Sequence, residues 1–269
     1  MQEISSLFRQ SGVRQALLEP VAQQSWRRGP ASPVLWQNEV HVWRVNLDGL
    51  RRDYFDDALS PEDRMRAARF RFAVDRRRFT VARASLRLVL ARYLEAGPAD
   101  LRFEHGAYGK PRLAIDQNRY GVQFNLSHSN QLALIAIARY REVGVDVEFI
   151  RPDFATDETA EHFFSSAELR QFASIDAETK TQAFFDCWTR KEAYIKARGE
   201  GLSFPLDQFD VSLAPDAPPR LLANRLDRED VSRWSFQGLF PAPQYAAALT
   251  VEGAFSRLLL WDLDEGPRG

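Results

Sequence analysis

Two acidic residues near the middle of the chain have the spacing of a metal site on a β-strand. Asp146 and Glu148 alternate with valines, so their carboxylates point to one face, roughly 7 Å apart at the backbone. Two such anions repel each other unless a cation joins them, and oxygen ligands of this kind suit Mg²⁺, which takes one or two carboxylates together with phosphate oxygens and water. The alternative is a solvent-facing strand edge that binds nothing.

A third acid and two lysines occur in a helical pattern further along the chain. Glu192 and Lys196 are four residues apart, which places them on one helical face, and Lys191 directly precedes the acid. The acid could complete a metal site while the lysine clamps a phosphate. A surface ion pair of little consequence explains the same spacing.

Further donors suited to phosphate come earlier. Ser127 and His128 offer a hydroxyl and a ring nitrogen, although a lone histidine is more often structural. Lys110 could place backbone groups against a base and its ammonium against a phosphate, or simply finish a turn. Residues 64–92 carry ten arginines against one acid. This cationic surface suits a phosphate-bearing ligand or an acidic partner, or it is a solvated helix face.

Composition excludes several classes of protein. The 269 residues are 45% hydrophobic and 27% charged, as in soluble globular proteins, and the net charge of −1 does not suit a nucleic-acid binder. No apolar run approaches the roughly 20 residues of a membrane helix, and the N-terminus lacks a signal-peptide pattern. One cysteine excludes an internal disulfide. We expect a cytoplasmic, soluble protein.

Local patterns predict the elements that must position these residues. Ser60 and Ser165 each begin a helix-start pattern, and Gly199 follows a long helical pattern as a stop signal. A mixed N-terminal segment predicts a short helix and a linker. The predicted strands cover about 40–47, 132–138, 143–150 and 245–251, with a turn over 103–111, and the predicted helices are a long one from Ser60, continuous or broken, and one over 181–197.

Four motifs follow one another in a specific order. They are Tyr-Gly-Lys-Pro at 108–111, Asn-Leu-Ser-His-Ser at 125–129, Gly-Val-Asp-Val-Glu at 144–148, and Trp-Thr-Arg-Lys-Glu-Ala-Tyr-Ile-Lys at 188–196. Together they closely resemble the Sfp-type 4′-phosphopantetheinyl transferases, over about residues 60–206. The resemblance implies an α/β (α+β) fold, a pseudo-dimer of two similar lobes, each a small sheet packed with helices, with coenzyme A in the cleft between them. The implied parts are an N-terminal extension (1–35), a first lobe (36–142) and a second lobe that carries the metal motifs (143–269).

The resemblance also implies roles for individual residues. The metal ligands are Asp146, Glu148 and Glu192. Lys196, with Lys191 as its companion, holds the pyrophosphate. The 3′-phosphate of coenzyme A is gripped by Arg78, Ser127 and His128, Arg66 is a further phosphate-side position, and the adenine contact is formed by Tyr108, Gly109, Lys110 and Pro111.

The implied activity is magnesium-dependent transfer of 4′-phosphopantetheine from coenzyme A to a serine of an apo acyl or peptidyl carrier protein. The enzyme would act as a monomer, without nucleic acid or membrane. Glu192, Lys196 and Glu168 are the candidate catalytic residues; Glu168 is either the base for the carrier serine or the acid of a helix capping box with Ser165. Asp63 stands where some family members have a lysine, which Arg64 or Arg69 could replace. A non-catalytic module that binds coenzyme A or a carrier is the alternative.

Overall fold

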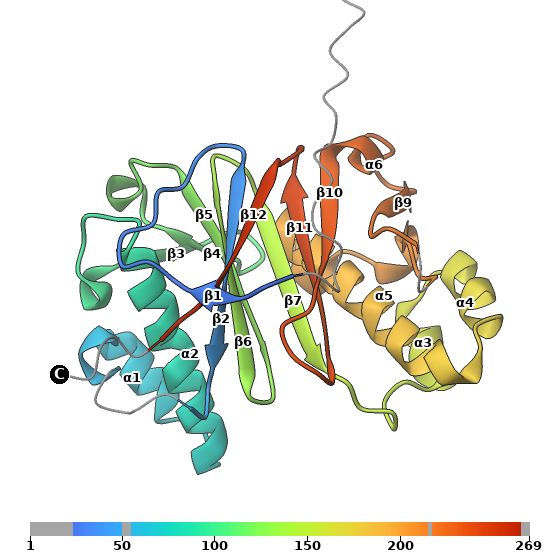
Figure 1. Ribbon diagram of the computed structural model, residues 1–269, viewed down its shortest axis with the longest axis horizontal. Helices are drawn as coiled ribbons and strands as arrows, with labels where there is room; N and C mark the ends of the chain where they lie inside the picture. The colour runs from blue at the N-terminus through green and yellow to red at the C-terminus, as the bar shows by residue number, and fades with distance from the viewer. Residues whose placement is uncertain (1–23, 50–54, 215–216, 265–269) are drawn as a thin grey trace, which may run out of the picture.

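The structure is a computed structural model that describes residues 24–49, 55–214 and 217–264 (Figure 1). Two sheets lie face to face between two long helices. The five-stranded sheet has the order β1 (Arg27–Arg28), β12 (Arg257–Asp262), β2 (Glu39–Asn46), β6 (Leu132–Arg139), β5 (Val122–Ser129). The three-stranded sheet has the order β10 (Trp234–Leu239), β11 (Tyr245–Glu252), β7 (Val143–Phe149). The other elements are the hairpins β3 (Phe103–His105) with β4 (Pro111–Leu113) and β8 (Phe209–Val211) with β9 (Leu221–Asn224), and the helices α1 (Pro61–Ala67), α2 (Ala73–Ala91), α3 (Asp157–Phe163), α4 (Ser166–Ala173), α5 (Ala177–Arg198) and α6 (Asp230–Arg233).

Three buried clusters define the layers. The first joins α2 to one face of the five-stranded sheet, the second joins the facing surfaces of the two sheets, and the third joins α5 and its neighbours to the outer face of the three-stranded sheet. Figure 1 shows this order, with α2 and α5 on opposite sides. The predicted mixed α/β fold, in which each lobe is a small sheet packed with helices, is confirmed.

A strand near the C-terminus crosses from the second lobe to the sheet of the first lobe. β12 falls within the range predicted for the second lobe, 143–269, but pairs in parallel with β2 and completes the first sheet. β1, within the predicted extension, pairs with the other edge of β12. The helix predicted near the N-terminus falls on residues outside the described part of the chain.

Local sequence signals predicted three helix ends correctly. The helix predicted from Ser60 is broken into α1 and α2, and the Ser60 side chain caps α1 by accepting from the Asp63 amide. Ser165 and Glu168 form the predicted capping box of α4. Gly199 ends α5 in the left-handed conformation, at φ 78°, which a residue with a side chain adopts less readily. No helix in the described part of the chain is long and apolar enough to cross a membrane.

Candidate active site

The close approach of α5 to β7 creates the site. A Cβ added to Gly144 on β7 would lie 2.1 Å from the carbonyl oxygen of Ala193 on α5. Only glycine therefore permits this contact. Because residues two apart on a strand share a face, Asp146 and Glu148 point from β7 toward the same helix.

Asp146 is at the centre of the site and is 1% exposed. Its Oδ1 accepts hydrogen bonds from Lys196 Nζ at 2.5 Å and from Ser127 Oγ at 2.8 Å. Its Oδ2 is buried and has no hydrogen-bond partner among the described residues. A buried carboxylate oxygen without a donor is costly, so this atom is suited to a cation.

The neighbouring acids are electrostatically coupled to Asp146. Burial and the charge of Asp146 raise the pKa of Glu148, and the same two causes raise the pKa of Glu192 to about 7. Burial opposes the charge of Lys196, but the three acids outweigh burial and raise the pKa of its ammonium. The single positive charge of Lys196 therefore cannot neutralise all three carboxylates when they are ionised.

The acidic residues fit magnesium by donor type and charge. Among the described residues, no three side chains of the kinds that bind metals already form a closed cluster. Magnesium does not require one, because it is commonly held by one or two carboxylates, with substrate phosphates and water as the remaining ligands. The unpartnered Asp146 Oδ2 and the raised pKa values of Glu148 and Glu192 are both consistent with a cation in this position.

A row of polar residues on β5 runs beside β7. Asn125, Ser127 and Ser129 occupy one strand face; the first accepts from the Val145 amide at 2.9 Å, and the serines donate to the two β7 carboxylates. We predicted no strand over 122–129 and no contact between these motifs. The alternation of polar residues was the available signal. Ser127, predicted to grip the 3′-phosphate, instead lies at the carboxylate site, where it also accepts from Lys196 Nζ at 3.0 Å.

Positive charge gathers beside the carboxylates. Burial lowers the pKa of His128, and the positive charges of Lys196 and Arg78 lower it further, so two cationic side chains lie near this imidazole. Arg78 also donates two hydrogen bonds to Asp48, at 3.1 and 2.7 Å. Arg78 therefore lies near enough to His128 to affect its pKa, and the joint contact of these two residues with the 3′-phosphate stays a prediction. Arg66 lies apart on the exposed face of α1, over the ring of Phe79.

The turn between β3 and β4 has two different parts. Tyr108 is 59% exposed and Gly109 has a φ of +84°, so backbone and an aromatic ring are accessible beside Pro111. The Lys110 side chain is buried, and its Nζ donates to Glu142 Oε2, the Val143 carbonyl and the Ala197 carbonyl. The backbone of this turn is therefore accessible for the predicted adenine contact. The Lys110 ammonium is not, because its hydrogen bonds link the two lobes.

Two predicted site residues are structural instead. Glu168 is 2% exposed and accepts from the Ser165 amide at 2.8 Å, the Val211 amide at 2.7 Å and Lys191 Nζ at 2.6 Å. Its buried position supports the capping reading, and we do not assign it as a base. Lys191 is 1% exposed and points away from Lys196, because five residues correspond to a rotation of about 140° around a helix.

Asp63 is likewise committed to the interior of the first lobe. Its carboxylate accepts from Arg83 at 2.8 Å and from Arg87 at 2.5 Å, and it is 4% exposed. The two arginines outweigh the effect of burial and hold the pKa of Asp63 below its usual value. Where a lysine could reach a phosphate, this chain has the acid of a buried ion-pair network.

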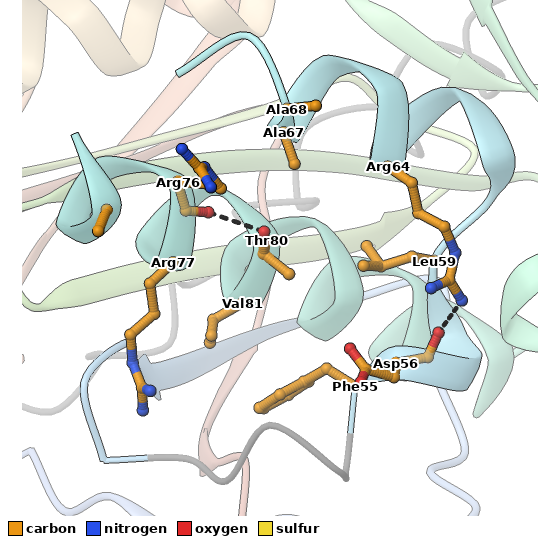
Figure 2. Close-up of a pocket in the computed structure, with 11 residues that line it drawn as sticks. Phe55, Asp56, Leu59, Arg64, Ala67, Ala68, Arg76, Arg77, Thr80 and Val81 are labelled. Carbon is orange, nitrogen blue, oxygen red and sulfur yellow. Dashed lines mark hydrogen bonds between the residues drawn. The ribbon is translucent and has the colours of Figure 1, made fainter. Parts of the chain in front are cut away.

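A separate cavity of about 420 Å³ lies between α1 and the first turns of α2 (Figure 2). Leu59 and Val81 contribute to its apolar wall, and Arg64, Arg76 and Arg77 line its rim. None of the side chains assigned above to magnesium or phosphate lines it.

Comparison with known proteins matches both halves of the chain to one family. Residues 51–139 match the N-terminal model of 4′-phosphopantetheinyl transferase, and residues 142–250 match the 4′-phosphopantetheinyl transferase superfamily model. The chain is 37% identical to the 4′-phosphopantetheinyl transferase HetI of Nostoc sp., over 86% of this chain and 95% of that protein. It is 33% identical to the 4′-phosphopantetheinyl transferase Sfp of Bacillus subtilis, over 60% of this chain and 70% of that protein.

Among solved structures, the Thermotoga maritima holo-[acyl-carrier-protein] synthase overlaps 42% of this chain and 62% of its own, with 23% identity and a TM-score of 0.34. The similarity to HetI extends over most of this chain and nearly all of that protein. The chain therefore belongs to the 4′-phosphopantetheinyl transferase superfamily and is a transferase of the Sfp type.

Proposed function

We propose that this enzyme transfers 4′-phosphopantetheine from coenzyme A to a serine of an apo acyl or peptidyl carrier protein, with magnesium bound at Asp146, Glu148 and Glu192. The observation that carries the proposal is the junction of β5, β7 and α5, where buried carboxylates lie next to Lys196 and the His128 region. The enzyme acts as a monomer in the cytoplasm, and its products are the holo-carrier and 3′,5′-ADP.

The acidic residues would hold the cation through carboxylate oxygens, including the unpartnered Asp146 Oδ2. When bound, magnesium neutralises charge on the pyrophosphate and polarises the attacked phosphoryl group. Phosphoryl transfer depends mainly on positioning and charge neutralisation, so the protein need not supply a covalent intermediate.

The protein's own side chains bind and orient the donor. Arg78 and His128 hold the 3′-phosphate, and the exposed turn at Tyr108 contacts the adenine. Lys196 stabilises the negative charge that develops on the leaving phosphate, where a fixed ammonium in a half-buried site acts strongly. The serine oxygen bonds to the phosphorus nearest pantetheine, the bond from that phosphorus to the bridging oxygen breaks, and the serine proton passes to solvent.

The test is to incubate the protein with coenzyme A, magnesium and a panel of apo-carriers, and to measure the mass of each carrier. We expect a mass gain of one phosphopantetheine group on at least one carrier, and no gain when magnesium is chelated. Metal-independent binding of coenzyme A with no carrier modified would instead indicate a non-catalytic binding module.

The arginine-rich first lobe is the proposed docking surface for an acidic carrier. Arg64, Arg76 and Arg77 line the rim of the cavity in Figure 2, whose wall is partly apolar. A carrier could therefore form ion pairs and apolar contacts at the same place. Raising the salt concentration should slow carrier association, because screening weakens electrostatic steering. An apparent carrier affinity that does not respond to salt would contradict this surface.

A further inference from the structure

The free edge of β7 is held by side chains of β5 instead of by a backbone ladder. β7 pairs with β11 on its other edge. Facing β5, the Val145 amide donates to Asn125 Oδ1 at 2.9 Å and the Phe149 amide donates to Ser129 Oγ at 3.1 Å. The first lobe therefore fixes the position of the strand that carries the acidic residues of the second lobe.

Ser129 has a second contact that Asn125 lacks. Its hydroxyl donates to Glu148 Oε2 at 2.7 Å while the same oxygen accepts from the Phe149 amide. The amide fixes where the hydroxyl oxygen lies, and the hydroxyl proton is directed at the carboxylate. The Glu148 side chain, which is only half-buried, is thereby held in one orientation.

We propose that Ser129 is a positioning residue for the transfer reaction, which orients Glu148 from across the boundary between the lobes so that this carboxylate can bind the cation. This inference rests on the proposed role of Glu148 as a magnesium ligand. Groups that hydrogen-bond to metal ligands affect metal binding strongly, since losing one commonly weakens affinity by about 10- to 100-fold.

Ser127 is less informative as a test. Its hydroxyl contacts both Asp146 and Lys196, so its removal would disturb a proposed ligand and a proposed phosphate clamp together. Asn125 is the matched control, because it accepts from the Val145 amide along the same edge of β7 and hydrogen-bonds no carboxylate among the described residues. A general weakening of this edge should therefore follow from Asn125→Ala as well.

The experiment compares Ser129→Ala, Ser129→Thr and Asn125→Ala in the full-length protein. Binding of Mn²⁺, used in place of Mg²⁺, is followed by electron paramagnetic resonance in the presence of coenzyme A and without a carrier. We expect Ser129→Ala to weaken Mn²⁺ binding by about tenfold. Ser129→Thr, which keeps the hydroxyl, should bind Mn²⁺ nearly as tightly as the unaltered protein. Asn125→Ala should lower the thermal midpoint of unfolding but leave the Mn²⁺ affinity nearly unchanged.

Two further measurements separate the possible failures. Glu148→Gln is tested in parallel: if it binds Mn²⁺ as tightly as the unaltered protein, the proposed metal site itself is wrong. If Glu148→Gln weakens binding but Ser129→Ala does not, only the positioning role is overturned. An equal loss of affinity in Ser129→Ala and Asn125→Ala would also overturn it, because the edge as a whole would then be responsible. Coenzyme A binding without metal should stay unchanged in Ser129→Ala.

Discussion

Lys196 Nζ lies 2.5 Å from Asp146 Oδ1, and this ion pair joins α5 to β7 at the centre of the candidate site. The Asp146 side chain is 2% exposed, so its charge needs a partner in the interior. The same ammonium also hydrogen-bonds Ser127 of β5. One lysine therefore connects the helix with a strand from each sheet, at the position proposed for phosphate binding.

Lys196→Ala should lower the rate of transfer at saturating coenzyme A by about a hundredfold, or about 3 kcal/mol of transition-state stabilisation. Lys180→Ala is the control on the same helix, because Lys180 pairs with Asp157 and lies in the first turns of α5. The measurement is the initial rate of carrier modification. Equal rates in the two variants would remove Lys196 from the reaction.

Glu192→Gln should lower transfer by at least about a hundredfold, because the amide removes one negative charge from the proposed metal shell while nearly preserving shape. Added magnesium should recover part of the loss through Asp146 and Glu148. Glu178→Gln, at an exposed position of the same helix, should have no effect. A folded Glu192→Gln protein with an unaltered rate at limiting magnesium would refute the ligand assignment.

His128→Ala and Arg78→Ala should weaken coenzyme A much more than they weaken 3′-dephospho-coenzyme A, because both side chains are assigned to the 3′-phosphate. Titration calorimetry with the two ligands gives the comparison. Arg76→Ala is the control, since Arg76 lines the separate cavity of Figure 2. If both ligands lose affinity equally, the 3′-phosphate lies elsewhere.

Glu168→Gln should reduce stability without removing catalysis. Glu168 and Lys191 have side chains that are each 2% exposed, and breaking such a buried pair costs about 3 kcal/mol or more. Urea unfolding should show the loss, while the remaining folded enzyme keeps a rate within a few fold of the unaltered protein. A stable variant with a greatly reduced rate would restore the hypothesis that Glu168 is the base.

Asp63→Asn should destabilise the protein at neutral pH by about 3 kcal/mol, because the buried guanidinium of Arg87 loses the negative charge that neutralises it. Since Arg83 and Arg87 hold the folded-state pKa below 3.8 despite burial, Asp63 stabilises the fold above pH 3.8 and loses this effect as the pH falls through its folded-state pKa. The stability difference between variant and unaltered protein should therefore shrink in acid. The measurement is urea unfolding at several pH values. For the control Asp75→Asn, at an exposed position, the difference in unfolding free energy from the unaltered protein should not change with pH.

The sequence by itself determined features that depend on neighbours in the chain. The Ser165–Glu168 capping box, the left-handed end of α5 at Gly199 and the shared face of Asp146 and Glu148 all follow from spacings of a few residues. Such patterns are set by backbone geometry that is the same in every helix or strand. The ordered motifs also sufficed to indicate the family, because their separation along the chain is specific.

Only the tertiary structure decided which side chains meet. Helical spacing places Lys191 and Lys196 on different faces of α5, but only the packing of α5 showed that Lys191 meets the buried Glu168 and Lys196 meets Asp146. The pairing of β12 with β2, and the contact of Ser129 with Glu148, join segments whose distance in space no local pattern encodes. These contacts depend on how the two sheets pack, which is settled by burial over the whole molecule and not by any single motif.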